Sequence, residues 1–436
     1  MRRPCDMSKL EKVLAFPRDT ERSPLPSCMS THCCASADYV REWQMPTPMP
    51  EYSPTVLHVI TGLANAGAEN FLLRLIKATS SLLGRQPVVR LRTVDDLDAA
   101  YGAAGVDVIA LGLDRLAEAP AAITRLAHII EECRPRMVFG WMYHGSLAAS
   151  LAARQVASVS RPQVTWNIRH GLQVGAAQSL TRRLAIRALP FMAGPPDVLT
   201  FNSARAAEAH GRLGYRARVT QVIPNGVDVH NFKPDAAAAS RLSALFRERA
   251  PYFAGQGPII GHVARVDPLK DHATAIKVFR HIAEARPDAR FMFIGAGTDR
   301  AEFCQRLLLA GIRERTAVLG ERRDIQALMP GLDLLLLTSR SEAFPNVLAE
   351  AMSCGVACVS TDAGEAEAIL GDVGMLAKLG DARNLGAHVL ALLAEPSDQA
   401  AARREAARCR AVRLLSFDHA VDRFVQIVIG AGVRPA

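Results

Sequence analysis

Short β-rich runs alternate with amphipathic helical stretches from residue 55 almost to the end of the chain. The first run, residues 56–60, has the composition of a buried strand, and residues 67–83 follow with apolar side chains on one helical face. Successive strands joined by helices pair in parallel through right-handed crossovers, and a parallel sheet is covered by helices on both faces. The alternation therefore predicts an α/β fold of the doubly wound class.

The predicted elements fall into two series. Residues 87–92, 106–110, 136–140, 163–167 and 198–201 continue the first series as strands; the second has strands at 259–264, 290–294, 333–337 and 356–360 and helices at 271–284, 346–353 and 385–393. A turn signal at residues 224–228 and a polar, alanine-rich stretch to residue 256 separate the two. We predict two tandem Rossmann-like domains, residues 54–230 and 231–411, facing each other across a cleft. A last helix, predicted at 417–429 within residues 412–436, must dock elsewhere, and we expect it to cross back to the first domain.

Length and composition agree with two domains. The chain has 436 residues, is 49% hydrophobic and 22% charged, and has no apolar run of the roughly 18 residues that would span a membrane. Residues 1–53, with seven prolines, four cysteines and no periodicity, predict a disordered extension. The nine cysteines lack Cys-x-x-Cys spacing and no apolar segment follows Arg2 and Arg3. We therefore expect a reduced, cytoplasmic setting without a disulfide framework, a zinc site or a secretory signal.

The formal net charge of +9 is distributed unevenly. Residues 133–196 contain no Asp or Glu and eight arginines: Arg134, Arg136, Arg154, Arg161, Arg169, Arg182, Arg183 and Arg187. Such a field attracts phosphates, anionic lipid headgroups or nucleic acid. The alternative is a basic surface that only aids solubility.

The strongest group of candidate residues follows the predicted strand at 333–337 and runs Ser341-Glu342-Ala343-Phe344-Pro345-Asn346-Val347-Leu348-Ala349-Glu350. Glu342 falls on a loop at the carboxyl edge of the sheet, and Asn346 is placed to cap the helix that begins there. The N–H groups of Val347 and Leu348, with the positive end of the helix dipole, would form an anion site suited to a diphosphate. Glu350, one turn further on, could accept hydrogen bonds from a sugar diol.

Cations and small residues follow other predicted strands. Arg265 and Lys270 close the loop after the strand at 259–264, where paired cations could stabilise a departing diphosphate. Gly62, Gly67 and Gly295 lie in turns whose small residues let backbone N–H groups approach a phosphate or sugar. These turns lack the dinucleotide fingerprint and the P-loop pattern, which argues against NAD enzymes and NTPases.

Two histidines follow strands of the first domain. His170, preceded by Arg169, and His144 would face the cleft, where an imidazole can bond a sugar hydroxyl or a reacting oxygen. A structural role in the loop is an equal alternative for each. Asp96 and its acidic neighbours open a helix and are interpreted as charges that compensate its dipole, so no metal site is predicted.

Glu342 and Glu350, with Phe344-Pro345-Asn346 between them, resemble the E-x7-E motif of family-4 retaining glycosyltransferases, which have the two-Rossmann GT-B fold. Other segments are similar to the same family: residues 62–69, Asn202-Ser203, residues 223–228, Arg265 with Lys270, and residues 361–365. The resemblance covers about residues 55–430. Ala66 departs from it, because a second glycine is usual at that position.

The resemblance implies a nucleotide-sugar donor held by the second domain and an acceptor held by the first. Transfer would retain the anomeric configuration without a bound metal, a further cofactor or a covalent intermediate. By analogy, Arg265 and Lys270 hold the diphosphate, Glu342 contacts the donor sugar, residues 344–348 cradle sugar and phosphate, Glu350 binds the ribose, and His170 lies near the reacting sugar.

The implied acceptor is a saccharide or a polyprenyl-diphosphate-linked saccharide, in polysaccharide or lipopolysaccharide assembly. A UDP-sugar is preferred to a GDP-sugar as donor, whereas the sugar and the linkage stay open. The arginine-rich segment would steer such an acceptor, and residues 178–191, with Leu180, Leu184, Ile186 and Leu189, are predicted to rest on an anionic membrane surface.

Two other functions are consistent with parts of the sequence. A nucleotide-sugar epimerase would share the donor cleft but need no second substrate, so donor turnover without acceptor would favour it. A basic nucleic-acid-binding protein would rest on the arginines alone, which lack aromatic interleaving or a helix-turn-helix pattern. Salt-sensitive DNA binding would support that reading.

Overall fold

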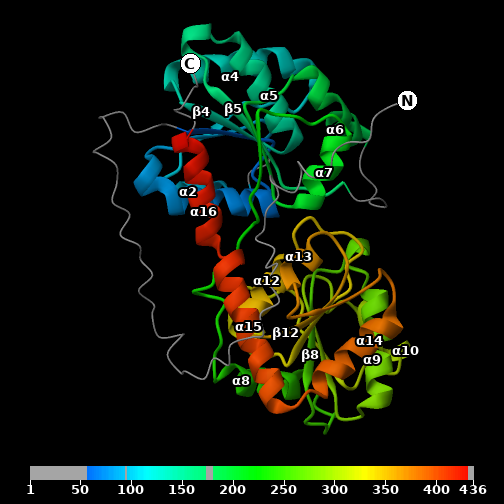
Figure 1. Ribbon diagram of the computed structural model, residues 1–436. Helices are drawn as coiled ribbons and strands as arrows, with labels where there is room; N and C mark the ends of the chain where they lie inside the picture. The colour runs from blue at the N-terminus through cyan, green and yellow to red at the C-terminus, as the bar shows by residue number, and fades with distance from the viewer. Residues whose placement is uncertain (1–55, 94–95, 173–179, 431–436) are drawn as a thin grey trace, which may run out of the picture.

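The computed structural model describes residues 56–93, 96–172 and 180–430, which form two lobes stacked one above the other (Figure 1). The predicted extension, residues 1–53, lies outside the described residues. The N-terminal lobe has a sheet of strand order β3-β2-β1-β4-β5-β6-β7, and the C-terminal lobe one of order β10-β9-β8-β11-β12-β13. Their strand pairs are parallel, with helices on both faces. The predicted pair of doubly wound domains is confirmed.

The N-lobe begins at β1 and includes the last helix of the chain. Its strands are β1 (Val56–Ile60), β2 (Val88–Arg90), β3 (Val108–Ala110), β4 (Met137–Trp141), β5 (Gln163–Ile168), β6 (Val198–Phe201) and β7 (Val219–Val222). Its helices are α2 (Gly67–Leu83), α3 (Asp98–Ala103), α4 (Ala119–Cys133), α5 (Met142–Gln155), α6 (Leu180–Met192), α7 (Ala204–Arg212) and, after the C-lobe, α16 (Phe417–Gly430). Short 3-10 turns occur at Leu116–Glu118 and Ser158–Ser160.

The C-lobe lies between the two parts of the N-lobe in sequence. Its strands are β8 (Ile259–Val263), β9 (Arg290–Ile294), β10 (Thr316–Val318), β11 (Leu334–Leu337), β12 (Ala357–Thr361) and β13 (Met375–Ala377). Its helices are α8 (Ala238–Arg249), α9 (His272–Ala285), α10 (Ala301–Leu309), α11 (Ile325–Leu328), α12 (Asn346–Ser353), α13 (Ala366–Leu370), α14 (Ala382–Leu393) and α15 (Ser397–Leu415), with 3-10 turns η3 (Pro268–Lys270) and η4 (Met329–Gly331). In the described part of the chain, no helix is long and apolar enough to cross a bilayer.

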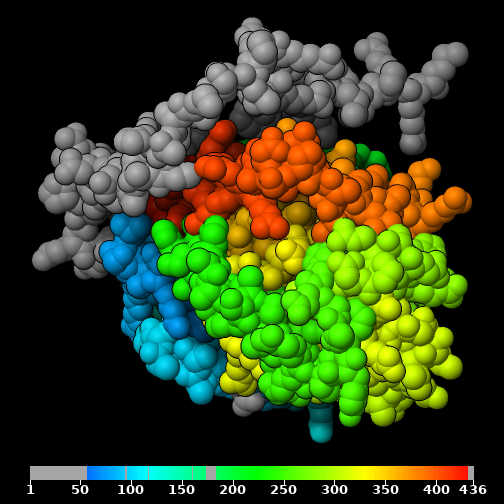
Figure 2. Space-filling model, turned by 90° about the horizontal axis from the view of Figure 1, so that it is seen from below, coloured from blue at the N-terminus to red at the C-terminus, as the bar shows by residue number. Residues whose placement is uncertain are grey.

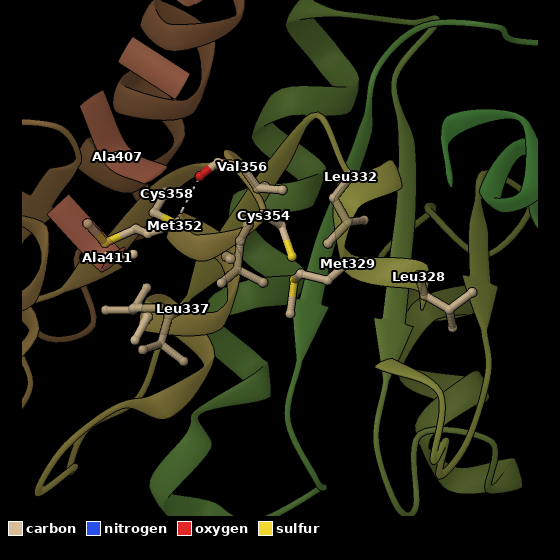
Figure 3. Packing of buried hydrophobic residues seen from close by; sticks show 14 of the residues in the cluster. Leu328, Met329, Leu332, Leu337, Met352, Cys354, Val356, Cys358, Ala407 and Ala411 are labelled. Atoms are coloured by element: carbon tan, nitrogen blue, oxygen red, sulfur yellow. Dashed lines mark hydrogen bonds between the residues drawn. The ribbon is translucent and has the colours of Figure 1, made fainter. Parts of the chain in front are cut away.

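A hydrophobic core packed against α12 fixes the position of that helix in the C-lobe. Side chains from η4, β11, α12, β12 and α15 fill one continuous core, including Met329, Leu337, Met352 and Ala411 (Figure 3). The small residues on α15 allow it to lie close to α12, which a larger side chain would prevent. Because α12 is packed against α15 and the sheet, its N-terminus is held in place at the edge of the sheet.

The chain crosses between the lobes twice, and the two crossings are bonded to each other. Val227 on the outward crossing donates its N–H to Leu415 O at 2.7 Å, and Phe417 on the return donates to Val227 O at 2.8 Å. Gly226 has φ 68°, and a Cβ there would lie 2.6 Å from the Phe417 Cα. Glycine is therefore required for both the turn and the close approach.

Helix α16 packs against α2 of the N-lobe, so the last helix returns to the first domain (Figure 1). Phe424 lies parallel to the indole of Trp141, with ring centroids 6.3 Å apart, and contacts Phe71 and Phe139 at 5.8 Å each. Seen from below, α15 and α16 run along one side of the molecule in orange and red, and the blue N-lobe lies beyond the green C-lobe (Figure 2). The N-lobe core is thus completed by residues from the far end of the chain.

We expect Phe424→Ala to destabilise the N-lobe by about 3–5 kcal/mol, because it removes a buried ring from an aromatic cluster and leaves a cavity. Denaturant unfolding followed by tryptophan fluorescence measures this, since Trp141 lies against Phe424. The control Phe191→Ala removes a ring that is 81% exposed and should change the unfolding free energy very little. Equal unfolding curves for Phe424→Ala and wild type would contradict the packing role of α16.

Candidate functional site

A pocket of about 430 Å³ opens at the carboxyl edge of the C-lobe sheet, where ligands bind in open parallel sheets. Seven of the residues predicted from the sequence line it. The lining consists of Phe232, Val263, Lys270, Arg323, Ile325, Gln326, Glu342, Phe344, Pro345, Asn346, Val347 and Glu350. The loops after β8 and β11 and the first turn of α12 therefore converge on one cavity.

Lys270 and Glu342 form an ion pair in this pocket. Lys270 Nζ lies 2.5 Å from Glu342 Oε1, and Ser339 Oγ donates to the same oxygen at 2.7 Å. Their side chains are only 23% and 12% exposed. Both charges are thus held at defined positions in a partly dehydrated setting, where electrostatic interactions are stronger than in bulk water. The sequence placed both residues near the cleft but did not predict that they pair.

The two loops that carry this pair are fastened to each other. Thr338 Oγ1 lies 3.0 Å from the carbonyl oxygens of both Lys270 and Asp271. Arg340 donates from Nε to Asp271 Oδ2 at 2.8 Å, and from its backbone N to Leu269 O at 2.8 Å. Asp271 has φ 45° and caps α9 by accepting from Thr274 N. Lys270 is therefore fixed by its backbone as well as by its ion pair.

Arg265 and Gly295 are not among the residues that line the pocket. The Arg265 side chain is 69% exposed and lies 3.4 Å from Asp267 Oδ2. Gly295 packs against the same loop, since a Cβ there would lie 2.2 Å from Ala264 O. Of the two expected cations, Lys270 lines the pocket, whereas Arg265 is exposed on the same loop. In the N-lobe, Gly62 is buried after β1, and Gly67 is the exposed first residue of α2.

The N-terminus of α12 differs in two respects from the expectation. Asn346 does not cap the helix: it is already the first helical residue, and its Oδ1 accepts from Asn225 Nδ2 at 2.8 Å, across the two lobes. Leu348 does not offer its N–H to a ligand, because that group donates to Pro345 O at 3.1 Å and the side chain is in the core. The anion site is therefore limited to the very first residues of the helix.

Asn225 links the N-lobe to this pocket. Its Oδ1 accepts from Arg169 Nη2 at 2.7 Å and from Asn202 Nδ2 at 3.3 Å. The Arg169 guanidinium carbon lies 3.6 Å from the centroid of the Phe71 ring, and burial lowers the pKa of Arg169 to about 9. Arg169, a candidate for the acceptor side, is thus two hydrogen bonds away from Asn346 in the donor pocket.

A second contact between the lobes surrounds Arg205, which the sequence did not single out. Its guanidinium bonds Asp362 at 2.8 Å and Glu367 at 2.9 Å, and its backbone N–H, in the first turn of α7, donates to Glu365 at 2.8 Å. A carboxylate is favoured at the positive end of a helix. The acidic segment after β12 therefore fastens to the N-lobe.

Burial raises the pKa of Glu350 to about 7, while the nearby Arg74 of the N-lobe acts in the opposite direction. The guanidinium of Arg74 lies 4.1 Å from the centroid of the Phe417 ring at the start of α16. Glu350 therefore changes its charge near neutral pH, unlike an ordinary surface carboxylate.

The two candidate histidines have different surroundings. His144 is exposed in the first turn of α5. His170 is half-buried after β5, with Nδ1 3.2 Å from the hydroxyl of Tyr143, which also lies 2.9 Å from His210 Nε2. Tyr143 and His210 were not predicted, because nothing in the local sequence indicates that they meet.

A cavity of about 470 Å³ lies at the opposite, amino edge of the same sheet. Its lining includes Arg286, which ends α9, and Leu393 at the end of α14. Helix C-termini carry partial negative charge, and arginines there compensate it. We therefore place the functional site at the carboxyl edge. Within the described ranges, no cluster of three or more His, Cys, Asp or Glu side chains could hold a metal ion.

Comparison with known proteins agrees with this geometry. Residues 65–231 match the profile of Glycosyltransferase Family 4, and residues 247–410 match that of Glycosyl transferases group 1. A GDP-mannose-dependent monoacylated alpha-(1-6)-phosphatidylinositol monomannoside mannosyltransferase of Corynebacterium glutamicum is 26% identical over 59% of this chain and 65% of its own. The lipopolysaccharide core mannosyltransferase LpsB of Rhizobium meliloti is 25% identical over 68% of this chain and 77% of its own. Relatives of 28–31% identity match over only 26–52% of their own length.

Among solved structures, Anabaena Alr3699/HepE in complex with UDP superposes with a TM-score of 0.73 at 20% identity, covering 86% of this chain and all of that one. The fold and the arrangement of the lobes thus define a GT-B protein. With both lobes matching profiles of glycosyltransferases, the chain belongs to the family-4 glycosyltransferases of this fold.

We expect the raised pKa of Glu350 to make stability depend on pH. Between the ordinary value of 4.5 and about 7 the folded state holds a proton that the unfolded state has released, so the free energy of unfolding falls as pH rises. The full effect is about 3 kcal/mol. Denaturant unfolding of wild type and Glu350→Gln at pH 5 and pH 8 isolates this contribution, because other titrating groups cancel in the difference. Parallel pH profiles for the two proteins would contradict it.

Proposed function

We propose that this protein transfers a sugar from a nucleotide-diphosphate donor to a saccharide or lipid-linked saccharide acceptor, with retention of configuration. The observation that carries the proposal is the Lys270–Glu342 pair, fixed in the same pocket as the N-terminus of α12. Retention is proposed from the E-x7-E motif of Glu342 and Glu350, and the setting, polysaccharide or lipopolysaccharide assembly, is in line with relatives such as LpsB.

The donor pocket is suited to stabilise a leaving diphosphate. Transfer breaks the bond between the anomeric carbon and a diphosphate oxygen and forms one to an acceptor hydroxyl oxygen, whose proton leaves with the diphosphate. The diphosphate gains negative charge as its bond to the sugar lengthens. Lys270 supplies a fixed cation, and the first residues of α12 add the positive end of a helix dipole. Because the fastened loops hold both in position beforehand, little reorganisation is needed during the reaction. We assign this stabilisation to the chain's own residues, without a metal ion or further cofactor.

Glu342 and Glu350 are assigned to the donor's hydroxyl groups. The Glu342 carboxylate, oriented by Lys270 and Ser339, can accept from a hydroxyl of the donor sugar. Glu350 lies further along the pocket and can accept from the ribose diol. Phe344 and Pro345 form an apolar wall beside them, and Arg265, exposed on the loop after β8, is assigned to the diphosphate together with Lys270.

We propose a UDP-sugar as the donor in preference to a GDP-sugar. The Anabaena protein of the same fold was solved with UDP and with UDP-glucose, whereas the Corynebacterium relative is GDP-mannose-dependent by name. A thermal-shift comparison of UDP, GDP and their sugar conjugates distinguishes the two, because a ligand that binds only the folded state raises the melting temperature. A larger shift with GDP would overturn the choice of base.

For the acceptor, we propose that the N-lobe contacts an anionic membrane surface through α6. Its outward face carries Arg183, Leu184, Arg187 and Phe191, and Leu184 and Phe191 are 61% and 81% exposed. The basic and apolar side chains thus share one face, as in helices that lie on membranes.

Two residues that the sequence assigned to this surface are elsewhere. Ile186 and Leu189 are buried in the N-lobe core, because they lie on the opposite face of α6. The side chain of Leu180 lies outside the described residues. Leu184 and Phe191 are therefore the apolar members of the proposed contact.

We expect Lys270→Met and Glu342→Gln each to lower kcat by about 10²–10³-fold, since each removes a fixed group that acts on the developing charge or on its orientation. Donor consumption with acceptor present measures the loss. Matched controls on the outward face of α9, Lys277→Met and Glu284→Gln, should retain activity.

A double variant separates catalysis from folding. Each single change leaves the other charge unpaired and only partly hydrated, which costs about 1–3 kcal/mol. Lys270→Met combined with Glu342→Gln removes both charges and should regain stability but not turnover. Wild-type kcat in either single variant would refute the assignment.

We expect the full chain to sediment with vesicles containing phosphatidylglycerol at low salt and to be released at high salt. Changing Arg182, Arg183 and Arg187 together to Ser should weaken this by about 100-fold, at roughly 1 kcal/mol per arginine.

A variant of equal charge serves as the control for vesicle binding. Arg247, Arg249 and Arg280 are exposed on the C-lobe, and changing them to Ser should leave vesicle binding close to wild type. Equal binding by both triple variants would exclude a specific role for α6.

A further inference from the structure

His170 is the first of three polar side chains that are connected in series. Its Nδ1 is 3.2 Å from the Tyr143 hydroxyl, which is 2.9 Å from Nε2 of His210, whose Nδ1 is 2.8 Å from Ala206 O. Tyr143 and His210 are 2% and 0% exposed. The three side chains come from α5, from α7 and from the loop after β5, so the contact brings together segments that are distant in sequence.

The directions of these hydrogen bonds follow from counting protons. A carbonyl oxygen only accepts, so His210 Nδ1 must carry a hydrogen and donate it to Ala206 O. In the neutral ring Nε2 is then an acceptor, and the hydroxyl of Tyr143 must donate to it. That hydroxyl has one hydrogen and has given it to His210. Its oxygen therefore accepts from His170, and Nδ1 of His170 carries a proton.

The neutral state of His210 agrees with its surroundings. Burial lowers the pKa of His210 to about 4. Its ring lies against Phe201 and Tyr215, with centroids 5.1 and 4.9 Å away. A charged imidazole would be poorly solvated among these rings, so a neutral ring is expected near pH 7.

The fold fixes Tyr143 with unusual tightness. Met142, just before it, has φ 58°, a left-handed conformation that costs about 1 kcal/mol or more in a residue other than glycine. A Cβ on Gly140 would lie 2.4 Å from Ser146 Cα, and one on Gly145 would lie 2.4 Å from Val59 O. The turn between β4 and α5 is thus pressed against β1, at the point where the strand order reverses and where ligands bind in this class of sheet.

Arg169, the neighbour of His170 in sequence, is connected to the donor pocket by hydrogen bonds. Arg169 bonds Asn225, and Asn225 bonds Asn346, which lines the pocket. The loop that carries His170 is therefore tied to the donor pocket through Arg169, although His170 itself is not among the residues that line the pocket.

We propose that Tyr143 and His210 are positioning residues that hold His170 in the tautomer with the proton on Nδ1, so that Nε2 is the nitrogen that accepts a hydrogen bond from a sugar hydroxyl. The inference rests on the proposed glycosyl transfer for its functional part, whereas the tautomer is a property of the protein alone. Because Tyr143 and His210 are buried, their effect on turnover passes through His170.

The tautomer is tested by nitrogen NMR on the full chain labelled with ¹⁵N-histidine, without ligand, near pH 7. The His170 and His210 signals are assigned by their loss in His170→Gln and His210→Gln. We expect a protonated Nδ1 in both rings of the wild type. In Tyr143→Phe the His170 ring loses the Tyr143 hydroxyl beside its Nδ1 and should populate the form protonated on Nε2. A wild-type His170 protonated only on Nε2, or an unchanged ring in Tyr143→Phe, overturns the proposal.

The functional part is tested by kinetics with a matched control. Tyr215 is a second buried tyrosine in the same cluster, whose hydroxyl donates to Ile186 O at 2.8 Å and makes no bond to His170. Tyr143→Phe should lower kcat about tenfold or more while the thermal shift caused by UDP stays unchanged, and Tyr215→Phe should affect kcat much less. Equal losses in both variants would show a merely structural role.

The two sets of results separate this inference from the proposed function. If no donor and acceptor pair is turned over by the wild type, the glycosyl-transfer proposal fails, but the NMR result still decides the tautomer. If transfer occurs and Tyr143→Phe retains wild-type kcat, the proposed function stands and the positioning role is refuted.

Discussion

The parallel direction of the paired strands in both sheets is the constraint on which the rest of the structure depends. Parallel pairing forces each connection to cross a face of the sheet as a helix, which buries both faces and leaves the chemistry to the loops at the edges. All the loops that follow strands then gather at one edge of each sheet. Residues as distant in sequence as Lys270 and Glu342 are brought within hydrogen-bonding distance in this way, although neither belongs to a strand.

Much of this architecture could be predicted from the sequence. The long buried strands, such as β1, β8 and β11, and the amphipathic helices α2, α9 and α16 have clear periodicity, and their order sets the topology. The edge strands β7, β10 and β13 were missed, because each has only three or four residues and no longer β-rich run surrounds it, as one surrounds the equally short β2 and β3. Helix α15 was missed for a different reason: its buried face consists largely of small residues, Ala407 and Ala411 with Leu415, so its amphipathic signal is weak.

Several residues that line the candidate pocket could be named from the sequence, but their contacts could not. Lys270, Glu342 and Glu350 share one pocket because each follows a strand of the same sheet, which the sequence order indicates. The partners that cross the cleft were not predictable. Asn225 bonds Asn346 over 121 positions and Arg205 bonds Glu365 over 160, and no local pattern encodes such a distance. Asn346 was expected to cap α12 because the local sequence does not show its contact with Asn225. Its side chain instead accepts a hydrogen bond from Asn225.

The paired crossings at Val227 and Ser416 place the C-lobe between two parts of the N-lobe. Because α16 completes the core that α2 and β1 begin, the whole C-lobe is an insertion within the N-lobe and not a module appended after it. Excising the inserted unit and rejoining its flanks would leave the host lobe covalently whole, whereas stopping translation after β7 would leave its aromatic cluster uncovered. Since β1 to β7 precede the C-lobe in sequence and α16 follows it, the ribosome makes the side chains that cover this cluster only after the inserted lobe.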